Sequence, residues 1–195
     1  MSLWCFMLIG QAFLIRQNFF KIHKILGRFS YILVPLILIS GFNTAHASLF
    51  GEVVHDGLYY STIALMFNSL VFFGVLYGFA IYNIRKPLIH ARYMVCTLFP
   101  MFTPLTDRLI YRNFPSMVSF LPALRGVPMV WLYGFGLANL MLVSLAIWDW
   151  QSKNRYKVFI YVLGLNIIYD LSVISFFKFS FWQRISDWIM SLPLS

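Results

Sequence analysis

Residues 157–178 read KVFIYVLGLNIIYDLSVISFFK, an apolar run with few polar residues. An α-helix crosses the hydrocarbon core of a bilayer with about 20 mainly apolar residues, so the run predicts a transmembrane helix. Two strongly polar side chains, Asn166 and Asp170, interrupt it. A carboxylate inside the membrane costs at least ~2.5 kcal/mol, faces the interior of a helical bundle and is a functional candidate. The stretch therefore predicts a membrane fold and its leading candidate residue.

Composition extends this prediction to the whole chain. Of its 195 residues, 61% are hydrophobic and 11% are charged, and the mean hydropathy is +0.77. Soluble domains are about half apolar and about a quarter charged. These figures exclude an ordinary water-soluble fold and predict a multi-pass membrane protein.

Five more apolar runs precede residues 157–178. Together they predict an all-α helical bundle with about six spanning helices, forming one transmembrane domain over residues 1–195. The predicted helices cover about residues 2–18, 25–45, 58–84, 88–111, 128–149 and 157–178. The first run is short and lacks the charged start and the small-residue cleavage site of a signal peptide. We expect either a shallow first helix or a natural N-terminus that is longer.

The final stretch, FSFWQRISDWIMSLPLS, follows a different pattern. Phe181, Trp182, Ile185, Trp188 and Ile189 recur at three-to-four spacing, with polar residues between them. Tryptophan prefers headgroup depth, and amphipathic helices lie in the plane of the interface. We predict a short interfacial helix over about residues 180–191 that acts as an anchor.

The net charge of +9 comes from cations that gather in short segments between the apolar runs. Cations along one exposed face would indicate nucleic-acid binding; this arrangement indicates membrane topology and argues against a nucleic-acid partner. Ten cations fall on one predicted side: Arg16, Lys21, Lys24, Arg28, Arg85, Lys86, Arg92, Lys153, Arg155 and Lys157. Five fall on the other: Arg108, Arg112, Arg125, Lys178 and Arg184. By the positive-inside rule the first side is cytoplasmic, which predicts an inner-membrane protein with both termini outside.

Two short motifs open predicted helices on the cytoplasmic side. They are KIHKILGR at residues 21–28 and RKPLIHARYM at residues 85–94. With these motifs, residues 11–112 resemble a widespread family of uncharacterised bacterial multi-pass membrane proteins with H-[RK]-x-L-G-[RW] and H-x-R-x-M helix starts. The matching residues are His23, Lys24, Leu26, Gly27 and Arg28, then His90, Arg92 and Met94. The resemblance implies a membrane fold more than an activity.

The sequence leaves the role of His23 and His90 open. Imidazole is the usual axial ligand of a b-type haem, and transmembrane cytochromes place two histidines on neighbouring helices at matching depth. Both histidines lie at the predicted membrane edge, whereas such cytochromes bury their ligands deeper. There are two alternatives to haem or metal ligation. One is structural: the histidines contact anionic lipid headgroups, and Gly27 allows close helix packing. The other is proton or quinone chemistry.

A polar seam is predicted around Asp170. Asn166 lies four residues before it and hence on the same helix face. Asn68 and Asn139 fall at similar depth in two other predicted helices, so both could face Asp170. Such a seam either joins helices by hydrogen bonds or forms a path for protons or a small molecule.

The predicted helix over 88–111 has two prolines in the stretch LFPMFTPLTDRLIYR, residues 98–112. Each proline removes a helical hydrogen bond, so we expect a kink, and broken helices line cavities in transporters. Arg108 and Arg112 share a face and are the expected partners of Asp107, of Asp170 or of an anionic ligand. A small-molecule cavity, if the chain has one, is expected to open outward here.

The predicted outer loop NTAHASLFGEVVHDGLYY contains His46, Glu52, His55 and Asp56. Two imidazoles and two carboxylates form a ligand set for a transition metal. A solvated loop without a metal is the alternative.

Three classes of function remain, because the sequence has no H-E-x-x-H, G-x-S-x-G or Walker motif of the soluble enzymes. The first is an accessory or structural membrane component without catalytic chemistry, serving a larger membrane complex. The second is a redox protein that binds haem b or is linked to quinone through His23 and His90. The third is a small transporter or sensor with a polar cavity around Asp170 and Arg108.

Overall fold

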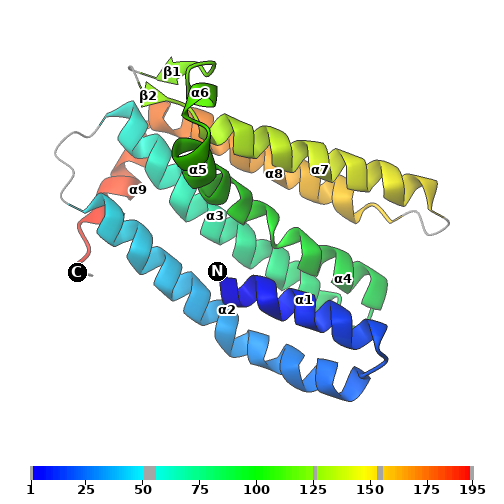
Figure 1. The fold of residues 1–195 in the computed structure, drawn as a ribbon. Coiled ribbons are helices and arrows are strands. Elements are labelled where there is room, and N and C mark those ends of the chain that lie inside the picture. Colours follow the sequence, from blue (N-terminus) through cyan, green and yellow to red (C-terminus); the bar gives the residue numbers. More distant parts are fainter. Residues whose placement is uncertain (1, 51–55, 125–126, 153–155, 194–195) are drawn as a thin grey trace.

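Helices account for nearly all the regular structure of the chain in its computed structural model (Figure 1). The structure describes residues 2–50, 56–124, 127–152 and 156–193. Its helices are α1 (Ser2–Arg16), α2 (Phe20–Leu49), α3 (Gly57–Tyr82), α4 (Pro87–Cys96), η1 (Phe99–Met101), α5 (Phe102–Asn113), α6 (Pro115–Val118), α7 (Trp131–Gln151), α8 (Val158–Ser175), η2 (Phe176–Lys178) and α9 (Ser180–Met190), where η marks 3₁₀ turns. Strands β1 (Ala123–Leu124) and β2 (Val127–Pro128) form one antiparallel pair. The predicted all-α class is confirmed, apart from this hairpin of two-residue strands.

Four helices are long and apolar enough to cross a membrane: α2, α3, α7, and α8 continued by η2. They cover the predicted spans over 25–45, 58–84, 128–149 and 157–178. Helix α1 extends roughly 22 Å at about 1.5 Å per residue, which is less than the ~30 Å hydrocarbon core. The described residues thus contain four candidate spans, and α1 is a shorter apolar helix.

The predicted helix over 88–111 is wrong as one continuous element. Helix α4 ends at Cys96, the 3₁₀ turn η1 follows, and α5 begins at Phe102. Pro100 lies in η1 and has no N–H for the carbonyl of Cys96, so the backbone tightens into 3₁₀ turns before the helix resumes. Trp4 of α1 packs at this break, where its Nε1 donates to Thr97 Oγ1 at 2.9 Å.

Helix α2 is longer at both ends than the sequence predicted. It begins at Phe20, not near residue 25, and ends at Leu49. The turn before it is closed by Asn18 with φ of 61°, a left-handed conformation that asparagine adopts more readily than most residues. Consequently His23 lies near the start of α2. The expectation that His46 lies in an outer loop is wrong, because it lies in the last turn of this helix.

Helix α3 is the central element of the bundle. It packs against α2, α4, α8 and α9, while α1 packs on α2 and α7 lies between α5 and α8. Eleven of its residues are buried, more than in any other described helix. Helix α9 contacts the start of α3, where Trp182 Nε1 of α9 donates to the carbonyl of Tyr60 at 3.1 Å.

The connections gather at two ends of the bundle. Figure 1 shows the α1–α2, α3–α4 and α7–α8 connections at one end, with α9 and the β1–β2 hairpin at the other. The first end, here called the cationic end, carries Arg16, Lys21, Lys24, Arg28, Arg85, Lys86, Arg92 and Lys157. The opposite end carries Arg108, Arg112, Lys178 and Arg184. Lys153, Arg155 and Arg125 lie outside the described residues.

Candidate functional site

Asp170 lies in a closed hydrogen-bonded cluster with two asparagines. Asn139 Nδ2 donates to Asp170 Oδ2 at 2.7 Å. Asn166 Nδ2 donates to the same oxygen at 3.2 Å and to Asn139 Oδ1 at 3.0 Å. Both acidic and amide residues of α8 are buried: Asp170 is 6% exposed and Asn166 is 1% exposed. The cluster thus surrounds a carboxylate with neutral amide donors.

Two helices position this cluster deep in the bundle. Asn166 and Asp170 are one turn apart on α8, and Asn139 reaches them from α7, which packs along α8. Counting from Val158 at about 1.5 Å per residue, Asp170 lies roughly 18 Å along its helix. This is beyond the middle of a ~30 Å hydrocarbon core. The cluster therefore joins two spans where an unpartnered carboxylate would be costly.

Asn68 belongs to a separate contact. Its Nδ2 donates to Ser172 Oγ at 2.8 Å, and Ser172 donates to the carbonyl of Tyr169 at 2.7 Å. The structure therefore joins α3 to α8 through Asn68, but this asparagine does not hydrogen-bond Asp170. The predicted seam is present as two neighbouring contacts and not as one cluster.

The predicted partners of Asp170 and Asp107 do not meet them. Arg108 and Arg112 are exposed, and within the described ranges neither guanidinium forms an ion pair with Asp107 or Asp170. Asp107 Oδ1 is buried without a hydrogen-bond partner there. Asp107 lies near Tyr169, whose hydroxyl donates to the carbonyl of Leu65 at 3.2 Å. Both arginine side chains are exposed and pair with neither carboxylate in the described residues, so the third alternative, an anionic ligand, stays a prediction.

The second histidine motif ties three helices together. His90 Nδ1 lies 2.7 Å from the carbonyl of Ala80 in the last turn of α3. A carbonyl only accepts, so Nδ1 carries the proton in this hydrogen bond. The Ala80 carbonyl is one of those that a helix end leaves without a backbone partner. His90 therefore caps α3 from α4.

Arg92, two residues further, forms an ion pair that the sequence analysis missed. Its Nε donates to Asp149 Oδ2 at 3.1 Å, and its Nη2 also contacts Asp149 Oδ1. The guanidinium lies 4.6 Å from the ring centroid of Tyr156. The two side chains are 12% and 1% exposed. The pair joins α4 to the end of α7, so Arg92 is more than a topology signal.

A sequence signal for this pair existed. Asp149 stands in the stretch WDW at the end of an apolar run, on the same predicted side as Arg92. A lone acid among tryptophans at the cation-rich boundary indicates a buried partner, because an unpaired buried carboxylate is costly. What the sequence could not indicate was which of ten cations it meets.

His23 lies in a polar corner at the cationic end. It is within electrostatic range of His90 and beside the backbone of Gln11 in α1. A Cβ on Gly27 would lie 3.9 Å from Gln11 Nε2, so α1 and α2 are close here. Gln11 is 7% exposed, yet neither amide atom has a hydrogen-bond partner among the described residues, nor has His23 Nδ1. The sequence analysis did not identify Gln11.

Two of the four residues of the predicted outer-loop metal set, His46 and Asp56, are described, so the set stays a prediction. His46 is 1% exposed and stacks on Phe50 with ring centroids 5.5 Å apart. Asp56 caps α3 by accepting from the backbone N–H of Tyr59 at 3.0 Å. Glu52 and His55 lie outside the described residues. The two described members therefore have contacts typical of helix ends.

Comparisons with known proteins leave these contacts as the basis for function. No protein-family model, no curated protein and no solved structure matches the chain.

Proposed function

We propose that this protein is an accessory or structural component of the membrane without catalytic chemistry of its own. The observation that supports it most is that Asp149 and Asp170, the two least exposed acidic residues in the described part of the chain, are both occupied by contacts between helices. Asp149 pairs with Arg92 of α4, and Asp170 accepts from Asn139 of α7. Polar groups that carry transport or catalysis face a water-filled cavity or a reacting group, whereas these brace one helix against another.

The proposed orientation follows from the cationic end. Cytoplasmic segments carry the excess of lysine and arginine, so this end faces the cytoplasm and contacts anionic headgroups of the inner membrane. In this proposal α1 is a shallow helix and the broken pair α4–α5 crosses the membrane; counting both as crossings gives six and puts both termini outside. In a larger membrane complex, the exposed apolar faces of α7 and α8 would be the surface for other subunits.

Helix α9 supports an interfacial position because its side chains divide into three sectors. Trp182, Ser186 and Met190 are buried against the bundle, whereas Phe181 and Trp188 are exposed and apolar. Between these sectors lie the polar residues Gln183, Arg184 and Asp187. One face for protein, one for lipid and one for water is the pattern of a helix at the headgroup boundary.

Reconstitution with Asp170→Asn tests the structural role against a transporter or sensor around Asp170 and Arg108. The natural chain in proteoliposomes is expected to show no pH-dependent uptake of protons or small solutes above empty vesicles. The variant is expected to change only the unfolding midpoint. Flux through the natural chain that Asp170→Asn abolishes would overturn the structural proposal.

A redox role is the second candidate, and one observation favours it. A histidine that ligates a metal almost always donates its other ring N–H to a carbonyl or carboxylate, and His90 Nδ1 does so to Ala80. His90 Nε2 and the nearby His23 are then the ligands of a haem b or another metal, or partners of a quinone. Absorption spectra of the purified protein, oxidised and dithionite-reduced, separate the two proposals: a Soret shift with an α band supports haem, and a colourless preparation rejects it.

A further inference from the structure

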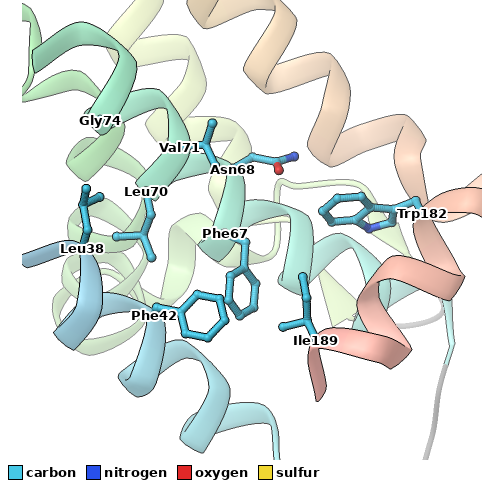
Figure 2. A pocket seen from close by; sticks show the side chains of 9 residues that line it. All are labelled: Leu38, Phe42, Phe67, Asn68, Leu70, Val71, Gly74, Trp182 and Ile189. Atoms are coloured by element: carbon cyan, nitrogen blue, oxygen red, sulfur yellow. The ribbon is translucent and has the colours of Figure 1, made fainter. Parts of the chain in front are cut away.

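An apolar groove runs along the bundle between α2, α3 and α9 (Figure 2). Its volume is about 390 Å³. Leu38 and Phe42 line it from α2, Gly74 lies on its α3 side, and Trp182 and Ile189 close it from α9. A liquid water molecule takes up about 30 Å³, so the groove has room for roughly a dozen groups of methylene size.

The lining of the groove is apolar, and the polar groups beside it already donate hydrogen bonds within the protein. Its one polar lining residue is Asn68, whose Nδ2 already donates to Ser172 Oγ at 2.8 Å. The indole Nε1 of Trp182 likewise donates to the carbonyl of Tyr60 at 3.1 Å. Phe42 and Phe67 meet edge to face, with centroids 4.9 Å apart. What remains for an occupant to contact is hydrocarbon and aromatic surface.

The groove also has a direction relative to the membrane. Leu38 and Gly74 lie near the middle of α2 and α3, while Trp182 and Ile189 belong to α9 at the opposite end of the bundle from the cationic end. Water entering such an apolar hollow would find no hydrogen-bond partners, so the hollow favours an apolar occupant over water. An occupant would therefore extend from headgroup depth toward the middle of the bilayer.

We propose that this groove holds one acyl chain of a membrane phospholipid, with its headgroup at the level of α9. A phospholipid fits better than an isoprenoid quinone for two reasons. The groove begins at the helix with the pattern of the headgroup boundary, and η2 and α9 carry Lys178 and Arg184, cations that attract a lipid phosphate. This inference rests on the interfacial position of α9 and not on the absence of catalytic chemistry.

Two glycines of α3 provide a matched test. Gly74 lines the groove, and a Cβ there would lie 3.7 Å from Leu38 Cδ1, an ordinary van der Waals contact. A Cβ at Gly78, one turn away, would meet nothing within 4 Å. Gly74→Leu and Gly78→Leu therefore add the same apolar side chain to the same helix, inside and outside the groove.

The experiment is native mass spectrometry of the full chain, purified in mild detergent and titrated with dioleoyl phosphatidylglycerol. The natural chain and Gly78→Leu are expected to retain one lipid, and Gly74→Leu to require at least a tenfold higher lipid concentration. Equal retention by both variants would overturn the proposal. Displacement of the retained lipid by a stoichiometric isoprenoid quinone would overturn the choice of phospholipid.

A second measurement uses only the natural protein, so it tests the proposal even if the Gly74→Leu variant does not fold. Phosphatidylglycerol with a diazirine near the end of one acyl chain is photolysed in proteoliposomes containing the natural protein. Crosslinks are expected to concentrate on residues 38–42, 67–74 and 182–189. Labelling of the exposed α8 residues Ile160, Ile168 and Leu171 at the same level would show only general lipid contact and would contradict a specific site.

Discussion

Asp149 and Asp170, two buried acidic residues of the bundle, are satisfied in opposite ways. Asp149, at the cationic end, is fully buried and meets the charged guanidinium of Arg92. Asp170, deep in α8, is 6% exposed and meets only neutral amides, from Asn139 and Asn166. The ion pair with Arg92 neutralises the charge of Asp149, whereas the two asparagines surround Asp170 with hydrogen-bond donors and no opposite charge.

This difference indicates which of the two contacts, Arg92–Asp149 or Asp170–Asn139, contributes more to the free energy of unfolding. Breaking a buried ion pair leaves an uncompensated charge and costs about 3–5 kcal/mol. Hydrogen bonds between membrane helices average about 0.6 kcal/mol, because the unfolded chain in a bilayer also finds partners. The Arg92–Asp149 corner is therefore expected to be the stronger brace, although Asp170 has the more unusual position.

Arg92→Met tests the corner and has the largest expected effect. It leaves Asp149 buried without its cation, so the free energy of unfolding should fall by about 3–5 kcal/mol. Unfolding by sodium dodecyl sulfate in mixed micelles, followed by circular dichroism, measures this loss. Arg85→Met is the control, because Arg85 is an exposed cation near the start of the same helix, and its effect should stay within about 0.5 kcal/mol.

Gly134→Ala tests the packing beside the Asp170 cluster. A Cβ there would lie 2.7 Å from Thr103 Cα and 2.6 Å from Thr106 Oγ1, so α5 must move away from α7. Overpacking of this kind costs roughly 1–3 kcal/mol, which the same unfolding assay would detect. Gly136→Ala is the matched control on α7, since a Cβ at Gly136 meets nothing within 4 Å. Equal losses for both variants would contradict the close α5–α7 contact.

Gln11→Met sharpens the comparison at the cationic end, where the buried amide of Gln11 has no hydrogen-bond partner in the described residues. Replacing an unsatisfied buried amide with an apolar side chain of similar length should raise the unfolding free energy by about 1 kcal/mol. Differential scanning fluorimetry in detergent measures the shift in midpoint. Gln17→Met, at an exposed position, should leave it unchanged. A lower midpoint for Gln11→Met would indicate that the amide binds something that the fold needs.

Asp170→Asn has the smallest expected effect. The new carbonyl oxygen still accepts from Asn139, so the loss should be about 0.6 kcal/mol and at most ~1.7 kcal/mol. A loss as large as that of Arg92→Met, in the same micelles, would reverse the ranking of the two carboxylates.

The sequence predicted the parts of this site that depend on spacing within one helix. Asn166 and Asp170 share a face because they are four residues apart, and Asn139 was one of two asparagines whose depth suggested contact with Asp170. Apolar run length likewise predicted the four long spans. Contacts between distant segments were less accessible: Arg92 meets Asp149 57 positions away, and nothing in a single sequence selects that pair.

Helix ends were predicted least well. The basic residues before Leu26 suggested a boundary, yet α2 begins at Phe20 because cations are tolerated in a helix that leaves the hydrocarbon. Two prolines predicted a kink in the run over 88–111, but the structure divides it into α4, η1 and α5. Asn68 contacts α8, but its partner there is Ser172 and not Asp170. Depth along the chain does not say toward which neighbour a side chain of α3 points.

The most direct test of the account is a double-mutant cycle on Arg92 and Asp149 in the unfolding assay. If the pair braces α4 against α7, Arg92→Met and Asp149→Leu should each destabilise the chain, because each leaves one buried charge. The double variant has no buried charge and should lie within about 1 kcal/mol of the natural chain. A double variant that loses the sum of the two single effects would show that the residues act independently and would contradict the brace.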